Sequence, residues 1–139
     1  MTVALAHQAS SAARHLALRE AARQAFLRQT DLAVIHIVES LDLDVADAYR
    51  NGLTDDIEAS LAGVGAQDVR WQLHLDVGDT DVAEKILELT DKVTAEVLVI
   101  GARRRSPVGK FFLGSVTQTL ILEAHVPVLV VKTEAGRPA

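Results

Sequence analysis

Several features that are common in other protein classes are missing from this sequence of 139 residues. It has no cysteine, which excludes disulfides and cysteine-ligated metal sites and is typical of a chain kept in the reducing cytoplasm. Aromatic residues make up only 4% of the sequence. The interior must therefore be built from Val, Leu, Ile and Ala, which favours an α/β protein over a small β-sandwich.

Two further absences restrict where the chain acts and what it binds. The first residues carry no basic segment followed by a long apolar one, so we expect neither a secretory signal nor a membrane span. The net charge is −5, whereas a general nucleic-acid-binding protein carries a basic surface. We therefore expect a cytoplasmic protein that binds no nucleic acid and no membrane.

What the sequence does contain is a regular alternation of apolar strand segments and helical segments. Strands are predicted at residues 3–6, 31–38, 69–77, 96–102 and 126–132. Helices are predicted between them at residues 10–29, 44–63, 80–93 and 114–125. Strict alternation requires right-handed crossovers and a mostly parallel sheet with helices on both faces. We therefore predict one three-layer α/β domain over residues 1–133, followed by a polar C-terminal tail at 134–139.

The last strand predicts how the protein assembles. It begins near Pro127, which cannot donate to a strand ladder and is expected near a strand start or at a sheet edge. Four consecutive apolar residues follow, namely Val128, Leu129, Val130 and Val131. A bare apolar edge invites pairing with another chain. We therefore predict a homodimer through this strand, and the alternative is that the tail or a helix covers the edge.

The segment 99–115, which leads from the end of the fourth strand into the last helix, is the best candidate for a binding site. It contains three glycines and three arginines, namely Gly101, Gly109, Gly114, Arg103, Arg104 and Arg105. Ligands of open parallel sheets bind beyond the carboxyl ends of the strands, and the free N–H groups of a helix N-terminus attract phosphate. The segment is not a P-loop, because Phe111 stands where that motif needs a hydroxyl.

At this loop the chain resembles the universal stress protein family. That family's signature is a strand that ends in Gly, then G-x2-G-x9-G-[ST] leading into a helix, then a strand that begins near Pro-Val. Gly101, Gly114, Ser115 and the segment HVPVLVVK match it in position. The resemblance covers essentially the whole chain. It implies a Rossmann-like fold of the adenine nucleotide alpha hydrolase type, with a five-stranded parallel sheet in the order 3-2-1-4-5 and a dimer through the last strands. For one branch it also implies ATP or another adenine nucleotide, with Mg²⁺, at this loop.

The resemblance also implies which residues would contact the nucleotide. They are Ala6, Ile37, Ile100, Gly101, Arg104, Arg105, Gly109, Gly114, Ser115 and Val116. Two of them depart from the pattern of nucleotide-binding members. Ala6 stands where those members have an Asp that contacts the nucleoside, and Arg104 stands where they have the second loop glycine. A guanidinium still offers phosphate a bidentate fork, so the arginines could hold a triphosphate in a different way.

Two functions from different classes stay open at this point. The first is a small dimeric stress-response module that binds an adenine nucleotide or a phosphate anion at residues 101–115. The second is a stress protein that binds no nucleotide and acts through protein–protein interaction. We expect no enzyme and no metal site, because the histidines lack metal-ligand spacing and Ser115 has no evident base partner. His36 is expected to be a hydrogen-bonded core residue, and His7 a loop residue for which contact with a ligand is the alternative.

Overall fold

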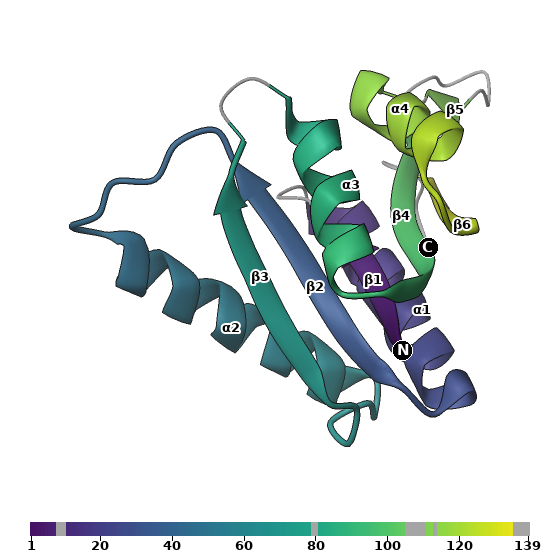
Figure 1. Ribbon diagram of the computed structural model, residues 1–139. Helices are drawn as coiled ribbons and strands as arrows, with labels where there is room; N and C mark the ends of the chain where they lie inside the picture. The colour runs from purple at the N-terminus through teal and green to yellow at the C-terminus, as the bar shows by residue number, and fades with distance from the viewer. Residues whose placement is uncertain (8–10, 79–80, 105–110, 113, 135–139) are drawn as a thin grey trace.

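The computed structural model describes residues 1–7, 11–78, 81–104, 111–112 and 114–134 (Figure 1). Within them the strands are β1 (Thr2–Ala6), β2 (Asp31–Val38), β3 (Trp71–Val77), β4 (Ala95–Arg104), β5 (Phe111–Phe112) and β6 (Val128–Glu134). The helices are α1 (Ser11–Arg28), α2 (Ala46–Gly63), α3 (Val82–Lys92) and α4 (Ser115–Glu123). Every predicted strand and helix is therefore present.

The parallel strands lie in the order β3-β2-β1-β4-β6. Because β6 is the fifth predicted strand, this arrangement confirms the predicted order 3-2-1-4-5. β1 pairs with β2 on one side and with β4 on the other, and its last four residues are buried. The chain moves outward from β1 to β3 and then returns to β4, so the strand order reverses between β1 and β4. In such sheets the carboxyl ends at this reversal form the usual ligand crevice.

Alternating side chains along each strand enter two separate cores, one on each face of the sheet. Val3 and Leu5 of β1 pack with α1 and α2, whereas Ala4 and Ala6 pack with α3 and α4. Figure 1 shows α3 and α4 in front of the sheet and α1 behind it. The predicted apolar stripe of α1 is confirmed, since Leu18, Ala21, Ala22 and Ala25 are all buried. Both faces of the central strands are thus covered, as their continuous apolar sequence predicts.

β5 was not predicted. It pairs antiparallel with Arg103 and Arg104, which extend β4 two residues beyond the predicted end at 102. β6 pairs with the same two residues along one edge of β4. β5 must therefore lie along the other edge, on which β1 pairs with the beginning of β4. Its backbone consequently lies past the carboxyl end of β1, where the strand order reverses.

Gly78, which follows β3, lies tightly against β2. Its N–H donates to the carbonyl of Val38 at 2.9 Å, and a Cβ added to it would lie 2.8 Å from Cγ2 of Ile37. Gly78→Ala is therefore expected to lower the free energy of unfolding by about 1–3 kcal/mol, because Ile37 would have to shift. Urea denaturation measures this difference. Gly63→Ala is the control, because its Cβ would meet no atom within 4 Å, and equal stability of both variants would contradict the close packing.

Candidate functional site

Four of the predicted nucleotide-binding residues lie in or against one core, on the face covered by α3 and α4. Ala6 at the end of β1 and Ile100 in β4 are buried members of that core. Ile37 near the end of β2 and Val116 in the first turn of α4 are half-buried and pack against it. The carboxyl halves of three parallel strands and the start of one helix therefore meet there. The resulting surface is apolar and made of small to medium-sized side chains.

Gly114 forms the N-cap of α4, beside these strand ends. Its carbonyl accepts the N–H of Gln118 at 3.0 Å, and its φ and ψ of −63° and 165° are extended. A Cβ on Gly114 would meet no atom within 4 Å. Neither backbone conformation nor internal packing therefore requires glycine here. The first N–H groups of α4, beginning at the exposed Ser115, have no acceptor within the helix and form the positive end of the helix dipole.

The remaining predicted residues lie along the segment that joins β4 to α4. Gly101 is half-buried in β4 and pairs with Val131 of β6. Arg104 is the last residue of β4 and pairs through its backbone, while its side chain lies outside the described part of the structure. Arg105 and Gly109 fall outside the described residues altogether. The structure thus describes the strand ends and the helix N-terminus of this region.

Comparison with known proteins identifies the family. The family model described as "Universal stress protein family" matches residues 1–132. The chain belongs to the universal stress protein family. A universal stress protein of Mycolicibacterium smegmatis is 40% identical over 116 residues, which are 84% of this chain and 86% of that protein. The family indicated by the glycine loop is therefore confirmed.

Solved structures of the family share the fold. The universal stress protein from Archaeoglobus fulgidus superimposes with a TM-score of 0.75 at 29% identity and covers 95% of this chain and 98% of that one. The structure of the universal stress protein from Archaeoglobus fulgidus in complex with dAMP has a TM-score of 0.70 at 25% identity, with the same coverage. This member of the family thus has the family's Rossmann-like α/β fold along nearly its whole length.

A chain of hydrogen bonds lies at the carboxyl ends of β1 and β2, on the opposite face of the sheet. Nδ1 of His7 lies 2.8 Å from Nδ1 of His36, and Nε2 of His36 lies 2.9 Å from the hydroxyl of Tyr49 in α2. Both imidazoles are buried. A bond between two Nδ1 atoms needs one donor and one acceptor, so the accepting ring must be neutral. This chain of contacts ties β1, β2 and α2 together.

The structure can be compared with the predictions made for the two histidines. His36 is a hydrogen-bonded core residue, as its place in an apolar strand predicts. His7 follows the end of β1, as expected of a loop residue, but it is buried, and its N–H donates to the carbonyl of Ile35 at 2.8 Å. Tyr49 was not singled out, because no spacing in the sequence places that part of α2 beside β2. The register of β1 against β2 brings the rings of His7 and His36 together.

Two features are absent from the residues that the structure describes. No group of three or more His, Cys, Asp and Glu side chains in that part of the chain is arranged to hold a metal ion. None of the described helices combines the length and apolar character that crossing a bilayer requires.

Proposed function

We propose that this universal stress protein binds an adenine nucleotide where the carboxyl ends of β1, β2 and β4 meet the N-terminus of α4. The observation that carries the proposal is the open space in front of Gly114, beside helix N–H groups that have no acceptor within the helix. The relative from Archaeoglobus fulgidus whose structure contains dAMP supports it. The binding residues would be those named from the sequence: Ala6, Ile37, Ile100, Gly101, Arg104, Arg105, Gly109, Gly114, Ser115 and Val116.

In the proposed site the base and the phosphate groups of the nucleotide have different surroundings. The base would lie on the apolar surface formed by Ile37 and Val116, with the small Ala6 leaving room beside it. The phosphate groups would accept hydrogen bonds from the first N–H groups of α4 and from the hydroxyl of Ser115. Arg104 and Arg105 would add positive charge. With ATP, Mg²⁺ would enter bound to the phosphates.

Mass spectrometry and calorimetry test the proposed nucleotide binding. Small molecules released from the freshly purified protein are identified by mass spectrometry, and AMP and ATP with Mg²⁺ are titrated by calorimetry. An adenine nucleotide in the released fraction, or saturable binding of either nucleotide, is the expected result. A clean released fraction together with no binding would overturn the proposal and favour a stress protein that acts through protein–protein interaction.

We infer a binding role for the chain and not a catalytic one. Ser115, the hydroxyl residue at the proposed phosphate position, is exposed on the first turn of α4 and has no evident base partner in the sequence. A cytoplasmic location is proposed from the absence of cysteine. We further propose that residues 1–133 act as one domain, with residues 134–139 as its tail.

We also propose that β6 pairs with β6 of a second copy. Among the described strands, β6 pairs with β4 alone, so its other edge has no strand partner there. Its apolar residues Val128, Leu129, Val130 and Val131 are only half-buried. Such an edge is stabilised by pairing with another strand, which would bury these side chains further.

The direction of the backbone groups in β6 allows a sharp test of the dimer. Leu98 N–H donates to the carbonyl of Pro127 at 3.0 Å, so the N–H and C=O groups of Leu129 and Val131 also face β4. The N–H of Val130 then faces the free edge. Val130→Pro is therefore expected to weaken dimerisation at least about tenfold with little loss of stability, because proline is tolerated where the N–H faces outward.

Val131→Pro is the matched variant. It removes an N–H that faces β4 and is expected to lower the free energy of unfolding by about 1–3 kcal/mol. Sedimentation velocity measures assembly, and urea denaturation measures stability. Unaltered dimerisation of Val130→Pro, or a monomeric unaltered protein, would rule out pairing through this edge.

A further inference from the structure

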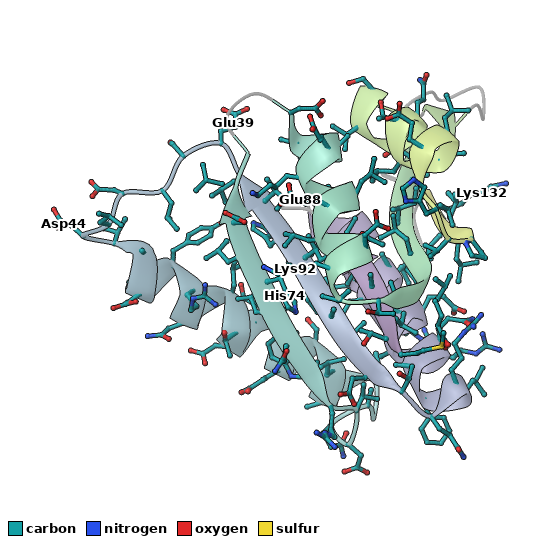
Figure 2. All side chains as sticks on the ribbon, viewed as in Figure 1. Glu39, Asp44, His74, Glu88, Lys92 and Lys132 are labelled. Carbon is teal, nitrogen blue, oxygen red and sulfur yellow. The ribbon has the colours of Figure 1, made fainter. Side chains whose placement is uncertain are left out.

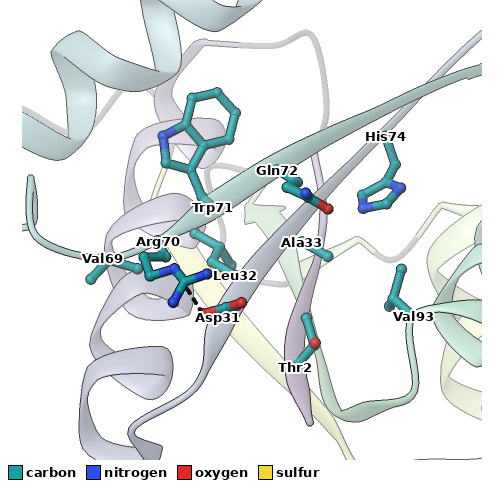
Figure 3. A pocket seen from close by; sticks show the side chains of 10 residues that line it. All are labelled: Thr2, Asp31, Leu32, Ala33, Val69, Arg70, Trp71, Gln72, His74 and Val93. Carbon is teal, nitrogen blue, oxygen red and sulfur yellow. Dashed lines mark ion pairs between the residues drawn. The ribbon is translucent and has the colours of Figure 1, made fainter.

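A cavity of about 540 Å³ lies at the amino ends of the strands, at the opposite end of the sheet from the proposed nucleotide site (Figure 3). Thr2 and Asp31, the first residues of β1 and β2, both line it. Ala33, which is buried, and Val93, just after α3, are among its apolar lining residues. Its volume is more than ten times the roughly 30 Å³ that one water molecule occupies in the liquid. It could therefore hold a small organic molecule.

The rim of this cavity carries positive charge that nearby carboxylates leave largely uncompensated. Arg70 lines it with 86% of its side chain exposed, and its Nε lies 3.9 Å from Oδ1 of Asp31. An exposed pair at that distance contributes little, so the guanidinium can turn toward a ligand. Asp31 is itself 58% exposed.

Lys92 adds a second cation. Lys92, the last residue of α3, lies beside His74 of the cavity wall (Figure 2). Among the described residues Lys92 forms no ion pair. Glu88, one turn before Lys92, lies 3.9 Å from Lys85 instead. Arg70 and Lys92 thus place two cationic side chains beside the cavity, and Asp31 is the one carboxylate among the residues that line it.

The surroundings of His74 lower its pKa. Burial, then the positive charges of Lys92 and Arg50, lower its pKa below the ordinary value of 6.5. Asp76, the carboxylate two residues further along β3, is paired with Lys85 at 3.4 Å. At neutral pH the imidazole of His74 is thus uncharged and offers one N–H donor and one acceptor nitrogen.

We propose that this cavity binds a small organic anion, with an apolar body against Ala33 and Val93 and a phosphate or carboxylate group between Arg70 and Lys92. A guanidinium and an ammonium are the side chains that hold such groups best, and the net positive rim stands out on a chain whose net charge is −5. His74 would donate a further hydrogen bond to the anion. The site is separate from the proposed nucleotide site and does not depend on it.

The test uses NMR of the whole chain with four probes: phenyl phosphate, benzoate, inorganic phosphate and the neutral molecule phenol. We expect phenyl phosphate or benzoate to give saturable shifts at the amides of Ala33 and Gln72, and at least tenfold stronger binding than phenol or inorganic phosphate. The stronger of the two identifies the anionic group. Because the bound anion offsets the positive charge of Lys92, it should also raise the pKa of His74 toward 6.5.

Two variants separate this site from a general attraction of anions. Arg70→Gln combined with Lys92→Gln should weaken binding at least tenfold. Lys85→Gln removes a cation of α3 that is already paired with Asp76 and Glu88, so it should leave binding unchanged. The proposal is overturned if phenol binds equally well, if the double variant binds as tightly as the unaltered chain, or if shifts are confined to Ile37, Ile100 and Gly101. Failure of AMP to bind while phenyl phosphate binds here would overturn only the proposed nucleotide site.

Discussion

Gly114→Asp is expected to abolish nucleotide binding while the fold keeps its stability. The new carboxylate would lie at the positive end of α4, where the phosphate groups of the proposed ligand would accept hydrogen bonds from the first N–H groups. Placing two like charges together costs several kcal/mol, so the affinity for AMP should fall by about 100-fold or more. Calorimetric titration with AMP measures the loss.

The same substitution should not harm the helix. The φ and ψ of Gly114 are extended, which any residue adopts, and its added Cβ would meet no atom within 4 Å. Aspartate is among the best N-cap residues and interacts favourably with the helix dipole, so stability should be unchanged or higher by about 0.3–1 kcal/mol. A lower melting temperature would contradict this account of the N-cap.

Gly114→Asn is the matched control. Asparagine has nearly the size of aspartate and is an equally good N-cap, but it carries no charge. We expect it to retain most of the affinity for AMP. If Asn and Asp weaken binding equally, the site requires glycine for space and not for charge. If Asp binds AMP as tightly as the unaltered chain, the phosphate groups do not lie at α4.

The fold could be predicted from the sequence because its main signals are local. Nearly continuous apolar runs at residues 31–38 and 96–102 are typical of strands covered on both faces, and both strands are central. The stripe on α1 likewise follows from helical spacing alone. β5 gives no such signal, because it has two residues, Phe111 and Phe112, and forms only where the end of β4 leaves an edge to pair with. Its existence depends on contacts between segments that no sequence window contains.

The candidate sites were predictable to different degrees. The residues at the strand ends and at Gly114 could be named because the glycine loop resembles that of a known family. The contact between His7 and His36 could not, because it depends on the register that pairs Ala6 with Ile35 and so places the next residues side by side. The cavity at the amino ends of the strands is formed by β1, β2, β3 and the end of α3. The cationic side chains beside it lie far apart in the sequence.

His36→Ala is expected to cause a large loss of stability, about 3 kcal/mol. His36 is 3% exposed and lies between His7 and Tyr49, at 2.8 and 2.9 Å. Alanine would leave a cavity in the core and remove one hydrogen-bond partner from each neighbour. Urea denaturation at constant pH measures the change in the free energy of unfolding.

Tyr49→Phe separates the hydrogen bond from the packing. Tyr49 is 37% exposed, so water can reach its surroundings, and loss of its hydroxyl should cost only about 0.5–1.5 kcal/mol. Combining the two substitutions should cost less than the sum of the separate effects, because in His36→Ala the hydroxyl has already lost its imidazole partner. Strict additivity would mean that the bond between His36 and Tyr49 does not stabilise the fold. A cost of His36→Ala no larger than that of Tyr49→Phe would mean that the buried imidazole is not part of the packed core that joins β1 and β2 to α2.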